Sequence, residues 1–310
     1  MANTFSGANA VTTSNAANFI PEVWSDEIVA AYKKNLVMAN LVKKMNFKGK
    51  KGDTVHIPSP VRGSASAKAA ANTVTLIAES DSDISVSINN HYEYSRLIED
   101  IVEAQALSSL RGFYTEDAGY ALAKQVDTTL IQLARGARGG NAANAAYTGG
   151  IIGSTGAAYT SGTSNAAAIA DAGIRKAIQI LDDQDVPMDG RSLVVPPTAR
   201  NSMLGIARFT EQAFKGTGST LMNGEFGDIY GVKVYVSTNC DTAAGNSATD
   251  RVALMFHRDW AVLVEQIGVR SQTQYKQEYL GTLFTADTRY GAAELRDYGA
   301  VPIVVDASAA

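Results

Sequence analysis

Residues Ile98–Leu133 read IEDIVEAQALSSLRGFYTEDAGYALAKQVDTTLIQL, and this stretch decides the fold class of the 310-residue chain. Its large apolar residues recur every three or four positions, which predicts one long helix, with a bend expected near Gly112 or Gly119. A helix of roughly 35 residues is about 50 Å long at about 1.5 Å per residue. That length exceeds most globular helices and predicts a structural beam.

Upstream of this helix the pattern changes to the two-residue alternation of β-strands. Residues 54–57 form a short alternating stretch ended by two prolines, and residues 84–88 alternate strictly between isoleucine or valine and serine. Small residues dominate 62–72, which predicts a projecting loop tip, and residues 74–77 suggest that the chain returns there as a second strand. These features predict an extended hairpin.

The N-terminal region combines a polar segment with a basic one. Residues 1–18 contain almost no large apolar groups, so we expect a flexible arm that orders only against a partner surface. An apolar stripe predicts a helix from Pro21 to Val37. Between Lys33 and Lys51 there are seven lysines and no carboxylate. This basic strip either meets an acidic partner, a neighbouring subunit or packaged DNA, or is a solvated face.

The rest of the chain mixes helices and strands. Residues 136–165 are nearly all small or polar and predict a surface loop. Helices are expected at 166–183 and 198–206, and strands at 193–195, 232–236, 252–256, 260–264, 282–289 and 300–305. This succession predicts an α+β fold.

Composition excludes several classes of protein. Hydrophobic residues make up 45% of the chain and charged ones 19%, a profile that a disordered chain does not have. The net charge of −4 gives no global attraction to nucleic acid, so any contact with DNA must be local and weak. Cys240 is the only cysteine, the first residues lack a secretory signal, and no apolar run reaches the roughly 18 residues of a membrane span. We expect a protein that assembles in a reducing cytoplasm and does not enter a membrane.

No catalytic or metal-binding motif is present. His56, His91 and His257 are far apart and have no HExxH spacing, and neither GxSxG nor GxxxxGK[ST] occurs. The carboxylates of Asp182, Asp183 and Asp185 could ligate a hard cation, but a solvated helix end explains them better. We therefore predict no catalytic residues, no metal and no cofactor. An α/β enzyme stays a rival that a convergent polar pocket would support.

Three stretches carry a resemblance to a known family. They are FIPEVWSDEIVAAYKKNLVMANLV at Phe19–Val42, GDTVHIP at Gly52–Pro58 and LFTADTRYGAAELRDYGAVPIVV at Leu283–Val305. With the order of the parts, they resemble the major capsid protein of tailed double-stranded-DNA bacteriophages, which has the HK97-like fold, and in particular T7-like podovirus coats, including those of cyanophages. An encapsulin-like compartment shell, which shares this fold, is the alternative.

The resemblance implies a division of the chain and a set of partners. The implied parts are an N-terminal arm (1–47), an extended loop (48–83), a peripheral domain with a spine helix (84–165), an axial domain (166–265) and C-terminal strands that complete the peripheral domain (266–310). It further implies hexamers and pentamers that close into an icosahedral head around double-stranded DNA, a scaffolding protein, a portal protein and, in some relatives, a decoration protein. The protein would be part of the virion after assembly in the host cytoplasm.

Charged residues around the hairpin are the candidate contacts between subunits. They are basic at Lys43, Lys44, Lys48, Lys50 and Lys51, and acidic at Glu79, Asp81 and Asp83. Some relatives crosslink covalently through a loop lysine, and Lys48, Lys50, Lys51 and Lys68 invite that comparison. Crosslinking also needs an amide partner and a carboxylate in one pocket, so we expect noncovalent locking.

Overall fold

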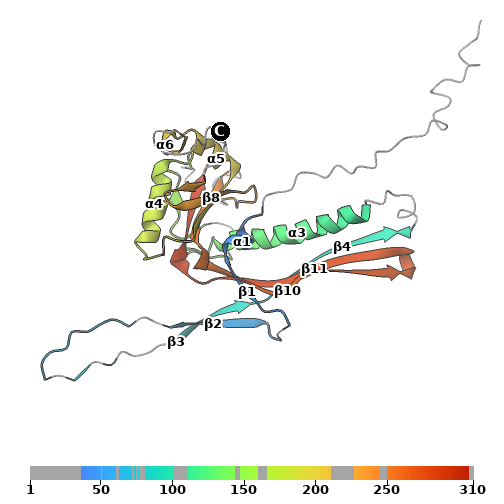
Figure 1. The fold of residues 1–310 in the computed structure, drawn as a ribbon, viewed down its shortest axis with the longest axis horizontal. Helices are drawn as coiled ribbons and strands as arrows, with labels where there is room; N and C mark the ends of the chain where they lie inside the picture. Colours follow the sequence, from blue (N-terminus) through green and yellow to red (C-terminus); the bar gives the residue numbers. More distant parts are fainter. Residues whose placement is uncertain are drawn as a thin grey trace, which may run out of the picture.

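The structure is a computed structural model that describes residues 36–49, 51–60, 63–71, 73–74, 76, 81–100, 110–143, 147–159, 166–210, 227–243 and 250–306. Two sheets organise these residues (Figure 1). The predicted arm (1–18) and most of the predicted helix at 21–37 lie outside them. Of that helix only residues 36–37 are described, and they precede the short helix α1 (Met38–Leu41) without being helical.

A four-stranded sheet forms a long arm of the molecule. Its strands are β1 (Lys43–Asn46), β10 (Ala261–Lys276), β11 (Gly281–Glu294) and β4 (Asn90–Glu99), in that order. The helix α3 (Leu110–Leu133) runs along this sheet (Figure 1) and packs its Ala118 and Leu122 against Phe284 and Ala286 of β11. Because the sheet and the helix share an apolar layer, they form one beam.

The predicted start of the long helix is wrong. Ile98 belongs to β4, which pairs with β11 along all ten of its residues, and residues 101–109 are not described. The exposure along β4 largely alternates, and Tyr92 and Tyr94 face the α3 side. That alternation carries into Ile98, where the sequence fits a helix equally well. Downstream, α3 continues through both Gly112 and Gly119.

A six-stranded sheet forms the body of the molecule. The order of its strands is β5 (Ile152–Gly153), β12 (Ala300–Val305), β9 (Arg251–His257), β6 (Arg191–Val195), β8 (Val232–Val236) and β7 (Asp228–Ile229). One face packs on α4 (Asp171–Asp182), α5 (Pro197–Leu204) and α6 (Ala207–Thr210). The other face shares a core with α1 and the C-terminal end of α3. The beam is thus anchored in the body.

The predicted surface loop at 136–165 is also wrong in large part. Tyr147, Ile151 and Tyr159 are buried, and β5 pairs with β12 in the six-stranded sheet. Glycine makes this possible, because a Cβ atom at Gly149 would lie 2.3 Å from the carbonyl oxygen of Ala137. Small residues serve here for close backbone packing, whereas their polarity suggested a projecting loop.

The remaining predicted elements are present with shifted ends. The helices expected at 166–183 and 198–206 are α4 and α5, and the strands expected at 193–195, 232–236, 252–256 and 300–305 are β6, β8, β9 and β12. The strands expected at 260–264 and 282–289 are parts of the longer β10 and β11, and Trp260 lies in a short 3₁₀ turn before β10.

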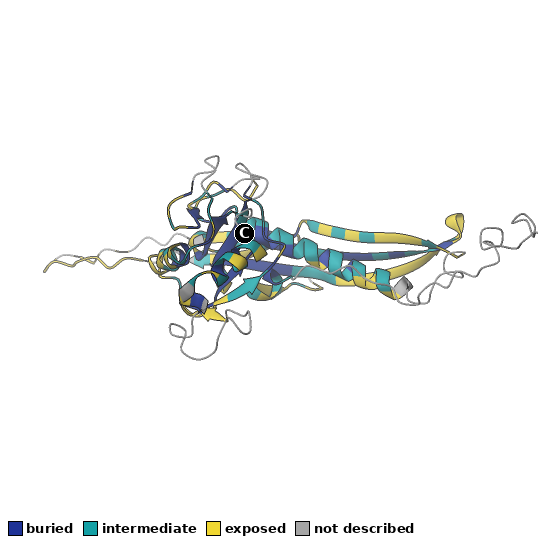
Figure 2. Cartoon of the chain, turned by 90° about the horizontal axis from the view of Figure 1, so that it is seen from above, coloured by how far each residue is buried: buried dark blue, intermediate teal, exposed yellow. Residues whose placement is uncertain are grey.

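The predicted hairpin projects from the body (Figure 1). Strand β2 (Thr54–Pro60) pairs antiparallel with β3 (Asp81–Ser87), and the chain between them extends away from both sheets (Figure 2). No strand is present at the described residues 73, 74 and 76, and the described returning strand is β3, from Asp81. Val74 and Leu76 are 68% and 87% exposed there.

A buried carboxylate, Asp127, and a partly buried one, Asp241, hold the body and the beam together. Asp127 of α3 accepts hydrogen bonds from the Met38 amide (2.8 Å) and from Nδ2 of Asn239 (3.0 Å). Asp241 accepts two hydrogen bonds from Arg135 at 2.7 and 3.0 Å and one from the Tyr147 hydroxyl at 3.1 Å. The first site ties α3 to the loop at 237–243, and the second ties the turn after α3 to the same loop.

Candidate functional site

Exposed lysines surround the point where the beam, the body and the hairpin meet. Lys43 and Lys44 lie on β1, and Lys48 follows it, with all three side chains exposed. Nζ of Lys44 donates to the Asn40 side chain at 3.2 Å. Strand β1 is held by parallel pairing with β10, so the first part of the basic strip stands on a rigid edge.

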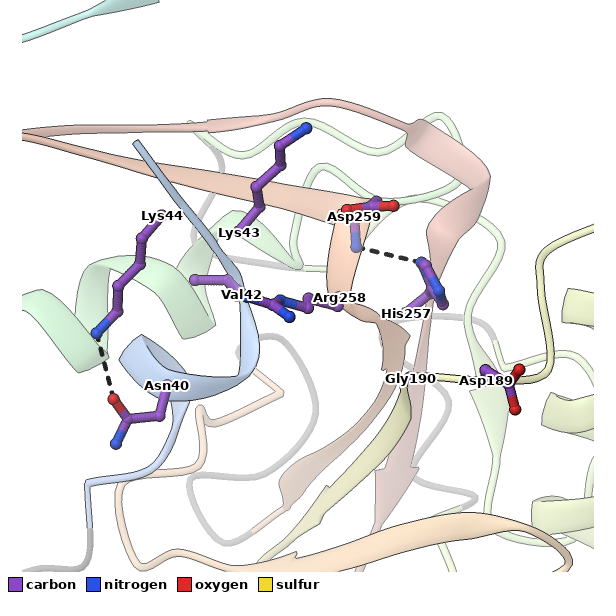
Figure 3. Close-up of a pocket in the computed structure, with 9 residues that line it drawn as sticks. All are labelled: Asn40, Val42, Lys43, Lys44, Asp189, Gly190, His257, Arg258 and Asp259. Carbon is purple, nitrogen blue, oxygen red and sulfur yellow. Dashed lines mark hydrogen bonds between the residues drawn. The ribbon is translucent and has the colours of Figure 1, made fainter. Parts of the chain in front are cut away.

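Lys43 and Lys44 line an open hollow with a volume of about 650 Å³ (Figure 3). The opposite wall comes from the loop before β6 and from the turn after β9, and contributes Asp189, His257, Arg258 and Asp259. His257 Nδ1 accepts from the Asp259 amide at 3.2 Å, so this ring caps a turn. Charges of both signs line the hollow, which suits ion pairs with another protein surface.

Asp83, the one acidic candidate whose side chain is described, is not paired with these lysines. Asp83 contacts Nδ1 of His56 across the hairpin, and both side chains are more than half exposed, at 59% and 65%. Asp81 belongs to β3, but only its backbone is described, while Glu79 and Lys50 lie outside the described residues. Lys51 is described and exposed. The assignment of all eight residues to contacts between subunits therefore stays a prediction.

His91 and Asp182, two other polar residues singled out in the sequence, have structural partners. His91 lies 3.2 Å from Asp287, which also accepts two hydrogen bonds from Arg270. The Arg270 hydrogen bond is the main cause that lowers the pKa of Asp287, and His91 adds to it. Asp182 forms an ion pair with the buried Arg191 at 2.7 Å. Across the described part of the chain, no group of three or more metal-ligating side chains comes together.

Sequence reasoning missed the carboxylate of Glu294 at the end of β11. Its Oε1 accepts a hydrogen bond from Nε1 of the buried Trp260 at 2.7 Å. Burial raises the pKa of Glu294 from 4.5 to about 7, against the lowering effect of that hydrogen bond. Alternation along β11 could place this residue on a face but could not reveal its buried surroundings.

The pH dependence of folding should report this group. Between about pH 4.5 and 7 the unfolded chain has released the Glu294 proton while the folded chain keeps it, so stability falls as pH rises. The Glu294→Gln variant keeps an oxygen for Trp260 and cannot ionise. In urea unfolding we expect the free energy of unfolding of this variant to exceed that of the parent by about 1–2 kcal/mol at pH 8. Near pH 4.5 the two values should be equal. An equal difference at both pH values would contradict the assignment.

Comparison with known proteins identifies the family. A family model described as phage capsid protein matches residues 27–306. The chain belongs to the phage capsid protein family. The capsid protein is accordingly a structural component of a phage shell and thus of the virion, and is not an enzyme. No curated protein sequence matches it.

Solved phage structures confirm the HK97-like fold of the capsid protein. A chain of Mycobacterium phage Che8 is similar with a TM-score of 0.74 and 25% identity, over 92% of the capsid protein and 97% of that chain. The capsid structure of cyanophage P-SCSP1u has a TM-score of 0.74 and 18% sequence identity, and the match covers 99% of the capsid protein and 100% of that chain. The capsid of Ralstonia phage GP4 has a TM-score of 0.68 and 16% sequence identity, and the match covers 93% of the capsid protein and 95% of that chain. The described helices include none that is long and apolar enough to cross a membrane.

Proposed function

We propose that this chain is the major coat subunit of a tailed phage and assembles as hexamers and pentamers into an icosahedral head around double-stranded DNA. Assembly in the host cytoplasm would use a scaffolding protein and a portal, and a decoration protein can be added outside. Family membership supports the shell, and the narrower assignment to T7-like podoviruses rests on the three quoted stretches alone.

The projecting hairpin is the observation that carries this proposal. A two-stranded hairpin is marginally stable alone, and this one is exposed along most of its length. Val74 and Leu76, near its tip, expose large apolar side chains to water. Neighbouring copies that cover the hairpin would remove this surface from water, so folding and assembly would share their free energy.

The division of the chain into parts is also proposed, with adjusted boundaries. Strand β12 belongs to the six-stranded sheet, although the C-terminal strands were expected to complete the peripheral domain. Strand β10, from Ala261, belongs to the four-stranded sheet. An axial domain that follows the six-stranded sheet would therefore have its main segment end near His257 and would also include Ile152–Gly153 and Ala300–Val305.

The test is expression with and without a scaffolding protein from the same genome, followed by electron microscopy. We expect closed shells or capsomer tubes, and a strong dependence on the scaffold. An encapsulin-like compartment would instead close without a scaffold. A small monodisperse oligomer in both conditions would contradict the proposed coat function.

The basic strip makes a separate prediction about assembly. Replacing Lys43, Lys44, Lys48, Lys50 and Lys51 with serine should reduce the yield of shells several-fold, because these cations could no longer pair with an acidic neighbour. The matched control replaces five lysines outside the strip, Lys124, Lys176, Lys215, Lys233 and Lys276. Both variants lose the same charge. An equal loss of shells in both variants, or an unchanged yield in the first, would contradict a specific role of the strip in assembly.

A further inference from the structure

Strand β10 has an irregular register close to the point where β1 ends beside it. Glu265 is level with Tyr290 of β11, and Ile267 is level with Arg289. Strand β10 therefore advances by two residues where β11 advances by one, and Gln266 is the inserted residue. A β-bulge of this kind bends its strand and re-aims a side chain, and it usually serves a specific purpose.

The re-aimed side chain of Gln266 reaches the root of the hairpin. Its Nε2 donates a hydrogen bond to the carbonyl oxygen of Gly52 at 2.9 Å, across 214 positions of the chain. Gly52 has a φ of 136°, which favours glycine, and β2 begins two residues later at Thr54. The bulge thus holds the backbone at the entrance to the outgoing strand of the hairpin.

The chain that leads into the hairpin also lies on the bulged stretch. The Phe47 amide donates to the carbonyl oxygen of Glu265 at 2.9 Å. Lys48 lies over Gly268, with its Nζ 3.1 Å from the position that a Cβ atom would take there. Residues 265–268 are therefore a seat for the hairpin root, and we call them the hairpin seat.

The two strands of the hairpin are attached to the beam in different ways. On the returning side Val86 and Ile88 are buried and pack against β10. On the outgoing side no described side chain of β2 is buried, and Gly49 and Gly52 before it both have the positive φ of a turn. The buried side fixes where the hairpin starts, and the Gln266 hydrogen bond restrains the direction that the outgoing side takes.

We propose that Gln266 is a positioning residue that sets the direction in which the hairpin projects and so lets the hairpin meet a neighbouring copy. The inference rests on the proposed function, in which neighbours cover the hairpin. The seven residues of β2 extend about 23 Å, so a tilt of about 10° at the root moves their far end by about 4 Å. Such a displacement exceeds the length of a hydrogen bond, so contacts with a neighbour would be lost.

Distances within the full-length, unassembled chain test the positioning role. Nitroxide labels on Ser66→Cys in the hairpin loop and Ser95→Cys on β4, both exposed positions, report the direction of the hairpin by pulsed electron paramagnetic resonance. The native Cys240 is buried, and burial raises its pKa to about 12, so it stays unlabelled. Gln266→Glu keeps the size of the side chain but removes the N–H donor, and should broaden the distance distribution about twofold. The matched control, Gln272→Glu, makes the same change on the exposed part of β10 that pairs with β11.

A third variant, Gln266→Lys, supplies an N–H donor again and should narrow the distribution towards that of the parent. A parent-like distribution in Gln266→Glu would overturn the positioning role. Equal broadening in Gln272→Glu would overturn it as well, because that change is made away from the hairpin seat.

The yield of shells tests the consequence for assembly. We expect Gln266→Glu to lower the yield several-fold relative to Gln272→Glu, with an unchanged midpoint of urea unfolding. A fall in yield that came with a lower unfolding midpoint and parent-like distances would show a purely structural role and overturn the proposal. A changed direction with an unchanged yield would overturn the role in assembly and leave the coat function standing. Failure of the parent chain to form particles would contradict the proposed function, and with it the role in assembly, whatever the distances show.

Discussion

Replacing Asp127 with alanine is expected to lower the free energy of unfolding by about 3 kcal/mol. The side chain is fully buried and accepts hydrogen bonds from the Met38 amide and the Asn239 amide group. Removing it leaves two buried donors without this acceptor, and each costs about 1–3 kcal/mol. Urea unfolding measures the loss, and hydrogen exchange at Met38 should rise because α1 loses its attachment to α3.

The matched control is Asp127→Asn. Burial raises the pKa of Asp127, which shows that the charge itself is disfavoured there. Asparagine keeps the size and one acceptor oxygen, so we expect it to lose less than half as much stability as alanine. Surface substitutions typically change the free energy of unfolding by no more than about 0.5 kcal/mol. If the alanine variant differed from the parent by no more than that, Asp127 would not be what joins α1, α3 and the loop at 237–243.

Gly173→Ala should also lower the free energy of unfolding, by about 3 kcal/mol. A Cβ atom there would lie 2.1 Å from the backbone carbonyl oxygen of Ser154, and no side-chain rotation relieves a clash with backbone. Helix α4 would have to move off the segment after β5, and its Ile174 and Leu181 would lose their packing in the body. Overpacking of this kind costs about 1–3 kcal/mol, occasionally more.

The same glycine-to-alanine change in α3 should have the opposite effect on stability. Gly119 has open space where a Cβ would be placed, and alanine favours a helix over glycine by about 1 kcal/mol. We expect Gly119→Ala to stabilise the chain by about 0.5–1 kcal/mol. Thermal unfolding of the two variants side by side gives the contrast.

Local periodicity predicted the elements whose surroundings match their pattern. Residues 84–88 alternate because one face of β3 is buried, and the apolar spacing of α4 follows from its single buried side. The predicted start of the long helix at Ile98 is wrong because Ile98 lies in β4, a strand whose tyrosines face α3 and whose apolar spacing also fits a helix. The Gly-rich segment around Tyr147 failed because packing between distant backbones leaves no signal in a local window.

Family and architecture were more predictable than the contacts of individual residues. The three quoted stretches indicated the capsid family, and the family match confirms it. Lysines on β1 could be recognised as a charge asymmetry, yet their neighbours Asp189 and Asp259 come from segments more than 140 residues away in the chain. Asp127, Asp241 and Glu294 drew no attention, because single carboxylates in apolar patterns are informative only when their burial is known.

Cryo-electron microscopy of assembled particles tests the central claim most directly. The claim is that copies of this chain build a closed shell in which neighbours cover the projecting hairpin. The map should show β2 and β3 lying against an adjacent copy, with Val74 and Leu76 removed from water. A hairpin folded back on its own body, or discrete small oligomers in place of shells, would contradict it.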